Sequence, residues 1–274
     1  MKMRILAAVV LLPLLLVVLI ALPPIFTGIM MAGVSAVAAF ELLWGTKLLK
    51  NPRLLVYTML AAAVTAIWCH VGCPYGWGLL GALVFCCVLW GEMLGAQGKL
   101  RFEKVLVCVA GGLLIPYLLC AIVRVRNMEM GNVYVLFPFA LAFLSDSGAY
   151  FAGRYLGKHK LAPIISPKKT VEGVFGGVAG AILGMMIFGL VLSLGFGLRV
   201  NFLLCIVYGV LGSLASVLGD LTFSVIKRQA NIKDYGNLIP GHGGILDRFD
   251  SMTIVAPLTE AMLILIPIAE KFNG

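Results

Sequence analysis

The sequence contains few charged residues. Lys, Arg, Asp and Glu fill 12% of its 274 positions, whereas hydrophobic residues fill 61%. A soluble domain carries about 25% charged residues, so a soluble globular protein is excluded. The hydrophobic residues occur in long unbroken runs such as "ILAAVVLLPLLLVVLIAL" near the N-terminus. Runs of this length predict segments that cross a membrane.

The runs also lack the alternation of polar and apolar residues that is typical of a transmembrane strand. Because unpaired backbone groups cannot lie in lipid, the spans are expected to be helices. The sequence therefore predicts an all-α, polytopic helical membrane protein with about nine transmembrane helices. The predicted spans are 5–22, 25–44, 54–71, 77–96, 105–123, 132–152, 171–194, 201–226 and 250–269.

Aspartate is absent from the first 145 residues. The five aspartates of the chain are Asp146, Asp220, Asp234, Asp247 and Asp250. Because these short carboxylates are the ligands that hard cations prefer, residues 131–274 are predicted to form a catalytic region with polar loops at 153–170 and 227–249. Residues 1–130 are predicted to form a lipid-facing transmembrane scaffold.

Two glutamates of that scaffold lie near the ends of predicted spans. For Glu41 and Glu92, solvation at a helix end is favoured over a place in a cleft for lipid headgroups. The Cys69-His70-x-x-Cys73 spacing has no further ligand set, so packing is favoured over a metal or disulfide site.

The net charge of +9 reflects an excess of Lys and Arg, and the positions of these residues predict which loops face the cytoplasm. In a polytopic protein, excess Lys and Arg is typical of cytoplasmic loops, and no nucleic-acid partner is expected. With the N-terminus in the cytoplasm, 17 of the 21 basic residues fall on that side; the exceptions are Arg124, Arg126, Arg199 and Lys271. A multi-pass protein of the cell membrane is predicted, with its N-terminus and both polar loops on the cytoplasmic side.

Asp220 lies in the eighth predicted helix. Asp220, Ser224, Lys227 and Arg228 recur at i, i+4, i+7 and i+8 and therefore share one helix face. A carboxylate in a membrane helix is costly and indicates a functional site. The structural alternative is a packing pair between the aspartate and a nearby Lys or Arg.

Asp247 and Asp250 stand three residues apart at the expected start of the ninth helix, so they are predicted to share a face. If the intervening loop folds back, both meet Asp220 at the cytoplasmic mouth of the two helices. Three carboxylates repel one another without a cation, and oxygen ligands with open positions favour Mg²⁺ together with substrate phosphates. A Mg²⁺ site is therefore predicted at these aspartates, with a second cation as a variant.

Two polar stretches are candidates for phosphate binding. "GHGG" contains His242, Gly243 and Gly244 and can form a nest of backbone N–H groups, although a plain turn has the same composition. "ISPKKTVEG" places Lys168, Lys169 and Thr170 before a helix, where phosphate can bind. The alternative for these lysines is ordinary cytoplasmic loop charge.

The segment "SVIKRQANIKDYGNLIPGHGGILDRFDS", residues 224–251, resembles the signature of the phosphatidate cytidylyltransferase (CDP-diacylglycerol synthase) family. That signature reads S-x-x-K-R, four residues, K-D, then P-x-H-G-G-x-x-D-R-x-D. Upstream, "SDSGAYFAGRYLGKHKLAPIISPKKTVEG" is similar to the other cytoplasmic segment of the family. The signature positions are Ser224, Lys227, Arg228, Lys233, Asp234, Pro240, His242, Gly243, Gly244, Asp247, Arg248 and Asp250.

The resemblance implies transfer of CMP from CTP to phosphatidic acid, a requirement for Mg²⁺, and a homodimer in the lipid bilayer. It implies that Asp220, Asp247 and Asp250 bind metal, and that Lys227 and Arg248 act in catalysis. Contacts to substrate phosphates are implied for Lys168, Lys169, Thr170, Ser224, Arg228, Lys233, His242, Gly243 and Gly244. Asp146 and Asp234 are further candidates, the latter as a support of the loop.

Four other functions fit parts of the pattern. A CTP-dependent lipid or polyprenol kinase, or an archaeal-lipid cytidylyltransferase, would share the nucleotide but differ in the other substrate or in the transferred group. A cation transporter would place carboxylates near the bilayer midplane in broken helices. A scaffold that binds anionic lipid would use the basic loops but leave the aspartates unexplained.

Overall fold

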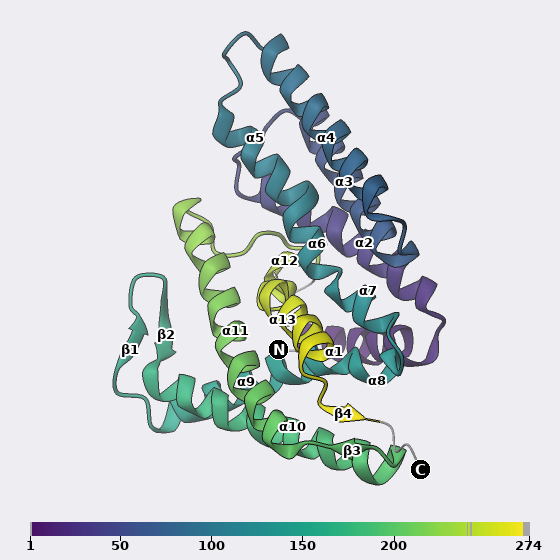
Figure 1. Ribbon diagram of the computed structural model, residues 1–274. Coiled ribbons are helices and arrows are strands. Elements are labelled where there is room, and N and C mark those ends of the chain that lie inside the picture. Colours follow the sequence, from purple (N-terminus) through teal and green to yellow (C-terminus); the bar gives the residue numbers. More distant parts are fainter. Residues whose placement is uncertain (1, 240, 242, 271–274) are drawn as a thin grey trace. The chain divides into compact units, whose positions relative to one another are not determined.

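The computed structural model describes residues 2–239, 241 and 243–270. Helices dominate these residues, and the four short strands form two antiparallel pairs (Figure 1). One pair is β1 (Lys160–Ala162) with β2 (Ser166–Thr170), and the other is β3 (Arg199–Val200) with β4 (Ala269–Glu270). The predicted all-α class is confirmed.

Seven helical stretches of the described chain are long and apolar enough to cross a membrane, which confirms a polytopic membrane protein. They are Pro24–Gly45, Pro52–Val71, Tyr75–Gly95, Phe102–Arg126, Gly131–Tyr155, Val171–Phe196 and Phe202–Gln229. The first of the nine predicted spans is also helical, because α1 (Lys2–Leu16) continues into η1 (Val17–Ala21), and the last is the shorter helix α13 (Met252–Leu265).

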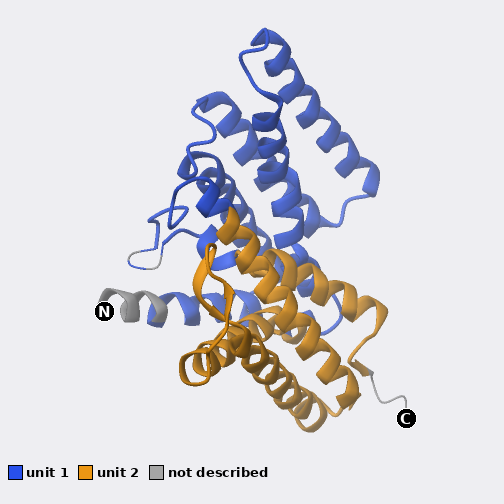
Figure 2. Ribbon diagram, turned by 90° about the vertical axis from the view of Figure 1, so that its left-hand side faces the viewer, with its two compact units in different colours: residues 1–132, 226–249 blue, residues 133–225, 250–274 orange. Residues whose placement is uncertain are grey.

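The chain divides into two compact units (Figure 2). The first contains residues 1–132 and 226–249, and the second contains residues 133–225 and 250–274. The helices of the first unit are α1 (Lys2–Leu16), η1 (Val17–Ala21), α2 (Pro24–Phe40), η2 (Glu41–Gly45), α3 (Pro52–Val71), α4 (Tyr75–Gly95), α5 (Phe102–Val109), η3 (Ala110–Leu114), α6 (Ile115–Leu119), α7 (Ala121–Arg126) and α12 (Leu246–Phe249).

The second unit contains α9 (Leu136–Tyr155), α10 (Val171–Phe196), α13 and both strand pairs. Helix α11 (Phe202–Gln229) belongs to the second unit up to Val225 and to the first unit from Ile226, and the short α8 (Gly131–Tyr134) also crosses the boundary.

Local chemistry explains where these helices begin and end. Pro24 occupies the first turn of α2, where a missing N–H costs nothing. Asn51 caps α3 by accepting a hydrogen bond from the Arg53 backbone N–H at 3.0 Å, and Gly72 ends α3 in the left-handed region. Thr170 caps α10 through the Gly173 N–H at 3.1 Å.

The core of the first unit joins α3, α4 and α5 to the end of α2. Its buried side chains are Leu43, Leu49, Leu54, Leu55, Phe85, Leu89, Val105 and Cys108. Leu43 lies in η2, a π-helical continuation of α2 that also contains Glu41. A π-helical turn is rare and is frequent at functional sites, and this one packs into the unit that contains the loop 227–249.

In the second unit, α9 and α10 run side by side (Figure 1). A Cβ on Gly148 would collide with the Gly176 carbonyl, so glycine allows the two backbones to touch. The Ser145 and Ser213 hydroxyls, 2.8 Å apart and buried, join α9 to α11. These contacts hold the part of α11 that leads to Asp220.

Candidate functional site

A buried ion pair holds the end of α11 to α12. The Lys227 Nζ donates to Asp247 Oδ1 at 2.9 Å, and the exposed fractions of the two side chains are 11% and 3%. The ammonium also lies 5.5 Å from the centre of the Tyr235 ring. A buried charge is stable only when it is paired and hydrogen-bonded, so each of these signature residues depends on the other.

Asp247 also organises residues 235–246, which are the later part of the segment between the two helices together with the first residue of α12; we name them the signature loop. Its Oδ2 accepts hydrogen bonds from the backbone N–H groups of Tyr235 at 2.8 Å and Gly244 at 3.0 Å. Both carboxylate oxygens of Asp247 are therefore engaged by the protein. In the predicted phosphate nest, the Gly244 N–H thus donates to Asp247. Gly243 adopts a φ of 90°, a backbone conformation that favours glycine.

Glu41 is a functional candidate that the sequence analysis placed wrongly. It was expected to be solvated, but it is only 3% exposed. Its Oε1 accepts a hydrogen bond from the Ile245 N–H at 3.0 Å, and its Oε2 accepts one from the Leu246 N–H at 2.8 Å. The polar partners are more than 200 residues away in the sequence, and no local pattern signals them.

Asp220 forms a second lysine–aspartate pair, within the second unit. The Lys169 Nζ lies 2.5 Å from Asp220 Oδ2, and the Ser224 hydroxyl donates to Asp220 Oδ1 at 3.1 Å. The shared helix face of Asp220 and Ser224 is thereby confirmed. The contact with Lys169 is also the kind of Lys–Asp packing pair that was the structural alternative for Asp220. In this structure the charge partner of Asp220 is therefore a lysine of the protein.

Asp250 does not continue the helix that contains Asp247. Helix α12 ends at Phe249 and α13 begins at Met252, so the expected helical i, i+3 relation is wrong. The reason is local: Asp250 Oδ1 accepts a hydrogen bond from the Ser251 N–H at 2.7 Å, and such side-chain bonds compete with the helix. A Cβ on Gly219 would lie 3.0 Å from the Asp250 carbonyl oxygen, so α11 packs on this turn one residue before Asp220.

Three aspartates were predicted to converge on a metal ion. Among the described residues, no group of three His, Cys, Asp or Glu side chains lies close enough together to hold one. Asp247 belongs to the first unit, whereas Asp220 and Asp250 belong to the second. The three-aspartate site therefore stays a prediction.

Most of the remaining candidates are exposed charged residues. Thr170 differs, since it is buried and its hydroxyl caps α10. Lys168 follows the turn of the β1–β2 hairpin, Asp146 lies exposed on α9, and His242 lies outside the described residues. The exposed candidates around the signature loop are Arg228, Lys233, Asp234 and Arg248.

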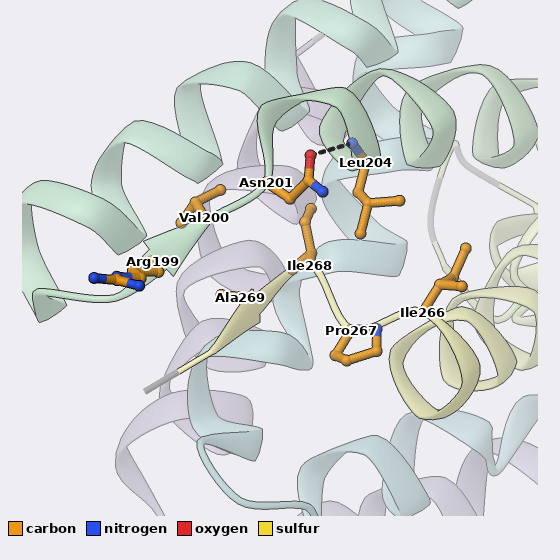
Figure 3. Close-up of a pocket in the computed structure, with 8 residues that line it drawn as sticks. All are labelled: Arg199, Val200, Asn201, Leu204, Ile266, Pro267, Ile268 and Ala269. Atoms are coloured by element: carbon orange, nitrogen blue, oxygen red, sulfur yellow. Dashed lines mark hydrogen bonds between the residues drawn. The ribbon is translucent and has the colours of Figure 1, made fainter. Parts of the chain in front are cut away.

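Two pockets of the structure are lined by none of the predicted site residues. One, of about 400 Å³, lies between the start of α11 and the segment after α13 (Figure 3). There the Asn201 side chain caps α11 by accepting hydrogen bonds from the Leu203 and Leu204 N–H groups. Leu204 is roughly 24 Å along α11 from Asp220, from the rise per residue. The other, of about 770 Å³, is an apolar groove lined by α3 and α4 residues such as Trp68 and Trp77.

Comparison with known proteins covers nearly the whole chain. Residues 2–266 match the sequence model of the cytidylyltransferase family. A phosphatidate cytidylyltransferase of Staphylococcus epidermidis is 47% identical over 134 residues, which are 49% of this chain and 50% of the relative.

Two further relatives bear the same name. The Bacillus subtilis phosphatidate cytidylyltransferase is 44% identical over 144 residues, 52% of each chain. The one of Staphylococcus aureus is 44% identical over 137 residues, 49% of this chain and 50% of the relative. The chain thus spans about half the length of the curated relatives it matches. Since the family model extends over residues 2–266, the chain belongs to the cytidylyltransferase family.

Proposed function

We propose that this membrane protein is a phosphatidate cytidylyltransferase, which transfers CMP from CTP to phosphatidic acid and releases pyrophosphate. The observation that supports this most is the match of residues 2–266 to the cytidylyltransferase family. The named activity of the relatives supports the same assignment. Charged residues are rare in the chain, so their concentration in its two polar loops indicates charged substrates.

The reaction requires control of charge more than removal of a proton. A phosphate monoester has a second pKa near 6, so phosphatidate is already a nucleophile at neutral pH. One of its phosphate oxygens forms a bond to the α-phosphorus of CTP, and the bond from that phosphorus to the oxygen bridging the β-phosphate breaks. Both reactants are anions, so cations that neutralise their repulsion accelerate the transfer.

The basic residues are suited to this task in two different ways. The side chains of Lys168, Arg228, Lys233 and Arg248 are exposed, and their positive charge suits contact with phosphates of CTP or of the lipid. Lys227 and Lys169 instead hold the carboxylates of Asp247 and Asp220 in place. We assign substrate contact to the first group and positioning of the aspartates to the second.

Mg²⁺ remains part of the proposal, with a second cation as a variant. Asp220 follows Gly219, which contacts the backbone of the Asp250–Ser251 turn, so the two aspartates stand on backbone segments that pack together. Mg²⁺ typically binds one or two carboxylates together with substrate phosphates and water, which fits this donor set. We assign Asp220 and Asp250 to the ion, with Asp247 as a further candidate. When bound, the ion would neutralise charge on the phosphates of CTP.

The proposed function is tested with the full-length protein purified in detergent. Supplied with CTP, phosphatidate and Mg²⁺, it is expected to form a cytidine-containing lipid and pyrophosphate in equal amounts, and to stop when a chelator is added. Folding is checked by gel filtration and circular dichroism. A folded preparation that forms no such lipid over several detergents and divalent metals contradicts the assignment.

We further propose that the signature loop faces the cytoplasm. A cysteine introduced at the exposed Asn237 is expected to react with a membrane-impermeant maleimide only when the inner face is accessible. The matched variant is Tyr75→Cys. Tyr75 is the first residue of α4 and is 76% exposed, and a cysteine there is expected to react only from outside. Labelling is measured above the background of the seven native cysteines, and reaction of both variants from one side contradicts this topology.

The homodimer is likewise a proposal, based on the family resemblance. Gel filtration with light scattering measures the mass of the protein in the detergent micelle. A mass near twice 29.3 kDa, after subtraction of detergent, is expected, and a monomer that is fully active contradicts it.

A further inference from the structure

Glu41 stands out because a buried carboxylate in a membrane helix is costly unless its hydrogen bonds are satisfied. It lies in η2, at the end of α2, and its two oxygens accept the N–H groups of Ile245 and Leu246. These N–H groups directly precede Asp247 and open α12, where they have no helical partner of their own. Glu41 therefore supplies the acceptors for the start of the helix that contains Asp247.

The signature loop is shaped to admit this side chain. A Cβ on Gly236 would lie 2.5 Å from Glu41 Oε1, and a Cβ on Gly244 would collide with both oxygens of the same carboxylate. Neither glycine has a positive φ. Their lack of a side chain thus serves the close approach of Glu41 rather than an unusual backbone conformation.

A second contact joins the same segments. At the other end of η2, a Cβ on Gly45 would collide with the Tyr235 carbonyl. The loop thus rests on η2 at both of its ends, near Tyr235 and near Leu246. The Tyr235 and Gly244 N–H groups, which donate to Asp247, lie in the part of the loop between these two contacts.

From these contacts we infer that Glu41 is a positioning residue of the cytidylyl-transfer site. It fixes the signature loop and the start of α12, and through them the orientation of Asp247 and its ion pair with Lys227. The catalytic consequence rests on the proposed function. The hydrogen bonds from Ile245 and Leu246 to Glu41, which we name the clamp, are a property of the fold. It gives the N-terminal region, expected to be only a scaffold, a part in building the site.

The first test measures the clamp without activity. Hydrogen–deuterium exchange in the full-length protein follows the peptides that contain Ile245 and Leu246. In Glu41→Gln, an amide donor replaces one acceptor oxygen, and exchange there is expected to accelerate roughly tenfold or more, as for loss of a hydrogen bond to a charged group. Glu92→Gln, a change at a half-buried carboxylate near the end of α4, is the matched control and is expected to leave this exchange unchanged.

The second test uses the glycine contact. Gly244→Ala alone is expected to increase exchange in the loop, because the new methyl group displaces the Glu41 carboxylate. In the Glu41→Ala background the space is open, so Gly244→Ala is expected to add little further effect. This non-additivity is expected only if the two residues are in direct contact. Additive effects contradict the packing, and a Glu41→Gln protein with wild-type exchange overturns the clamp.

The third test concerns catalysis. In Glu41→Gln, kcat is expected to fall at least roughly tenfold, while KM for phosphatidate changes little, because the variant misplaces Asp247 and Lys227 without removing a substrate contact. Faster exchange with unchanged kcat would overturn the positioning role. An inactive wild-type protein would refute the proposed function, whereas the exchange measurements would still decide whether Glu41 holds the loop.

Discussion

Asp247→Asn is expected to lower turnover by about 100-fold, because the variant loses the carboxylate that orients Lys227 and the signature loop, and to destabilise the fold, because breaking a buried ion pair by removing one partner costs about 3–5 kcal/mol. The carboxylate receives the Lys227 ammonium on one oxygen and two backbone N–H groups on the other. An asparagine offers one acceptor and one donor. In either orientation its NH₂ group faces a donor, so either Lys227 or the loop loses its partner. Steady-state turnover of the folded variant measures the effect.

A double variant separates lost folding from lost chemistry. Lys227→Met with Asp247→Asn removes the uncompensated buried ammonium, and it is expected to restore stability relative to Asp247→Asn while remaining inactive. Thermal unfolding in detergent provides the stability readout. Turnover close to wild type in Asp247→Asn would show that the aspartate neither organises the loop nor takes part in the reaction.

Asp220→Asn is expected to have an effect of similar size, at least about 100-fold, and to raise the Mg²⁺ concentration that supports half-maximal turnover. Loss even of a residue that only supports a metal ligand typically costs 10–100-fold, and Asp220 is proposed as a ligand itself. The measurement is turnover as a function of Mg²⁺ at saturating CTP.

Two neighbouring variants serve as comparisons for Asp220. Ser224→Ala removes one hydrogen bond to the carboxylate, and a several-fold effect of about 1 kcal/mol is expected. Lys169→Gln removes the cation that pairs with Asp220, and it is expected to lower the Mg²⁺ concentration required. A Mg²⁺ dependence of Asp220→Asn equal to wild type would remove Asp220 from the proposed metal site.

The helices were predictable because their signals are local. The length of apolar runs, together with residues such as Pro24, Asn51 and Gly72, places their beginnings and ends. The shared face of Asp220 and Ser224 follows from helical periodicity, and the 3.1 Å hydrogen bond confirms it. The break of the helix at Asp250 was not predicted. There the Asp250 side chain accepts a hydrogen bond from the neighbouring Ser251 N–H, and such local hydrogen bonds compete with those of a helical turn.

The partners of the charged residues were not predictable from local patterns. Lys169 comes from the β1–β2 hairpin and Asp220 from the middle of α11. Glu41 meets Ile245 and Leu246 across more than 200 residues of sequence. Without these contacts a glutamate at a span end is more plausibly solvated, and the glycines at 236 and 244 look like ordinary loop residues.

The most direct test of the central claim distinguishes transfer of CMP from transfer of the γ-phosphate. Purified protein is incubated with phosphatidate and with CTP labelled with ³²P either at the α- or at the γ-position. Label is expected in the lipid product from α-labelled CTP alone, and in pyrophosphate from γ-labelled CTP. Label in the lipid from γ-labelled CTP would indicate a CTP-dependent lipid kinase and contradict the proposed cytidylyl transfer.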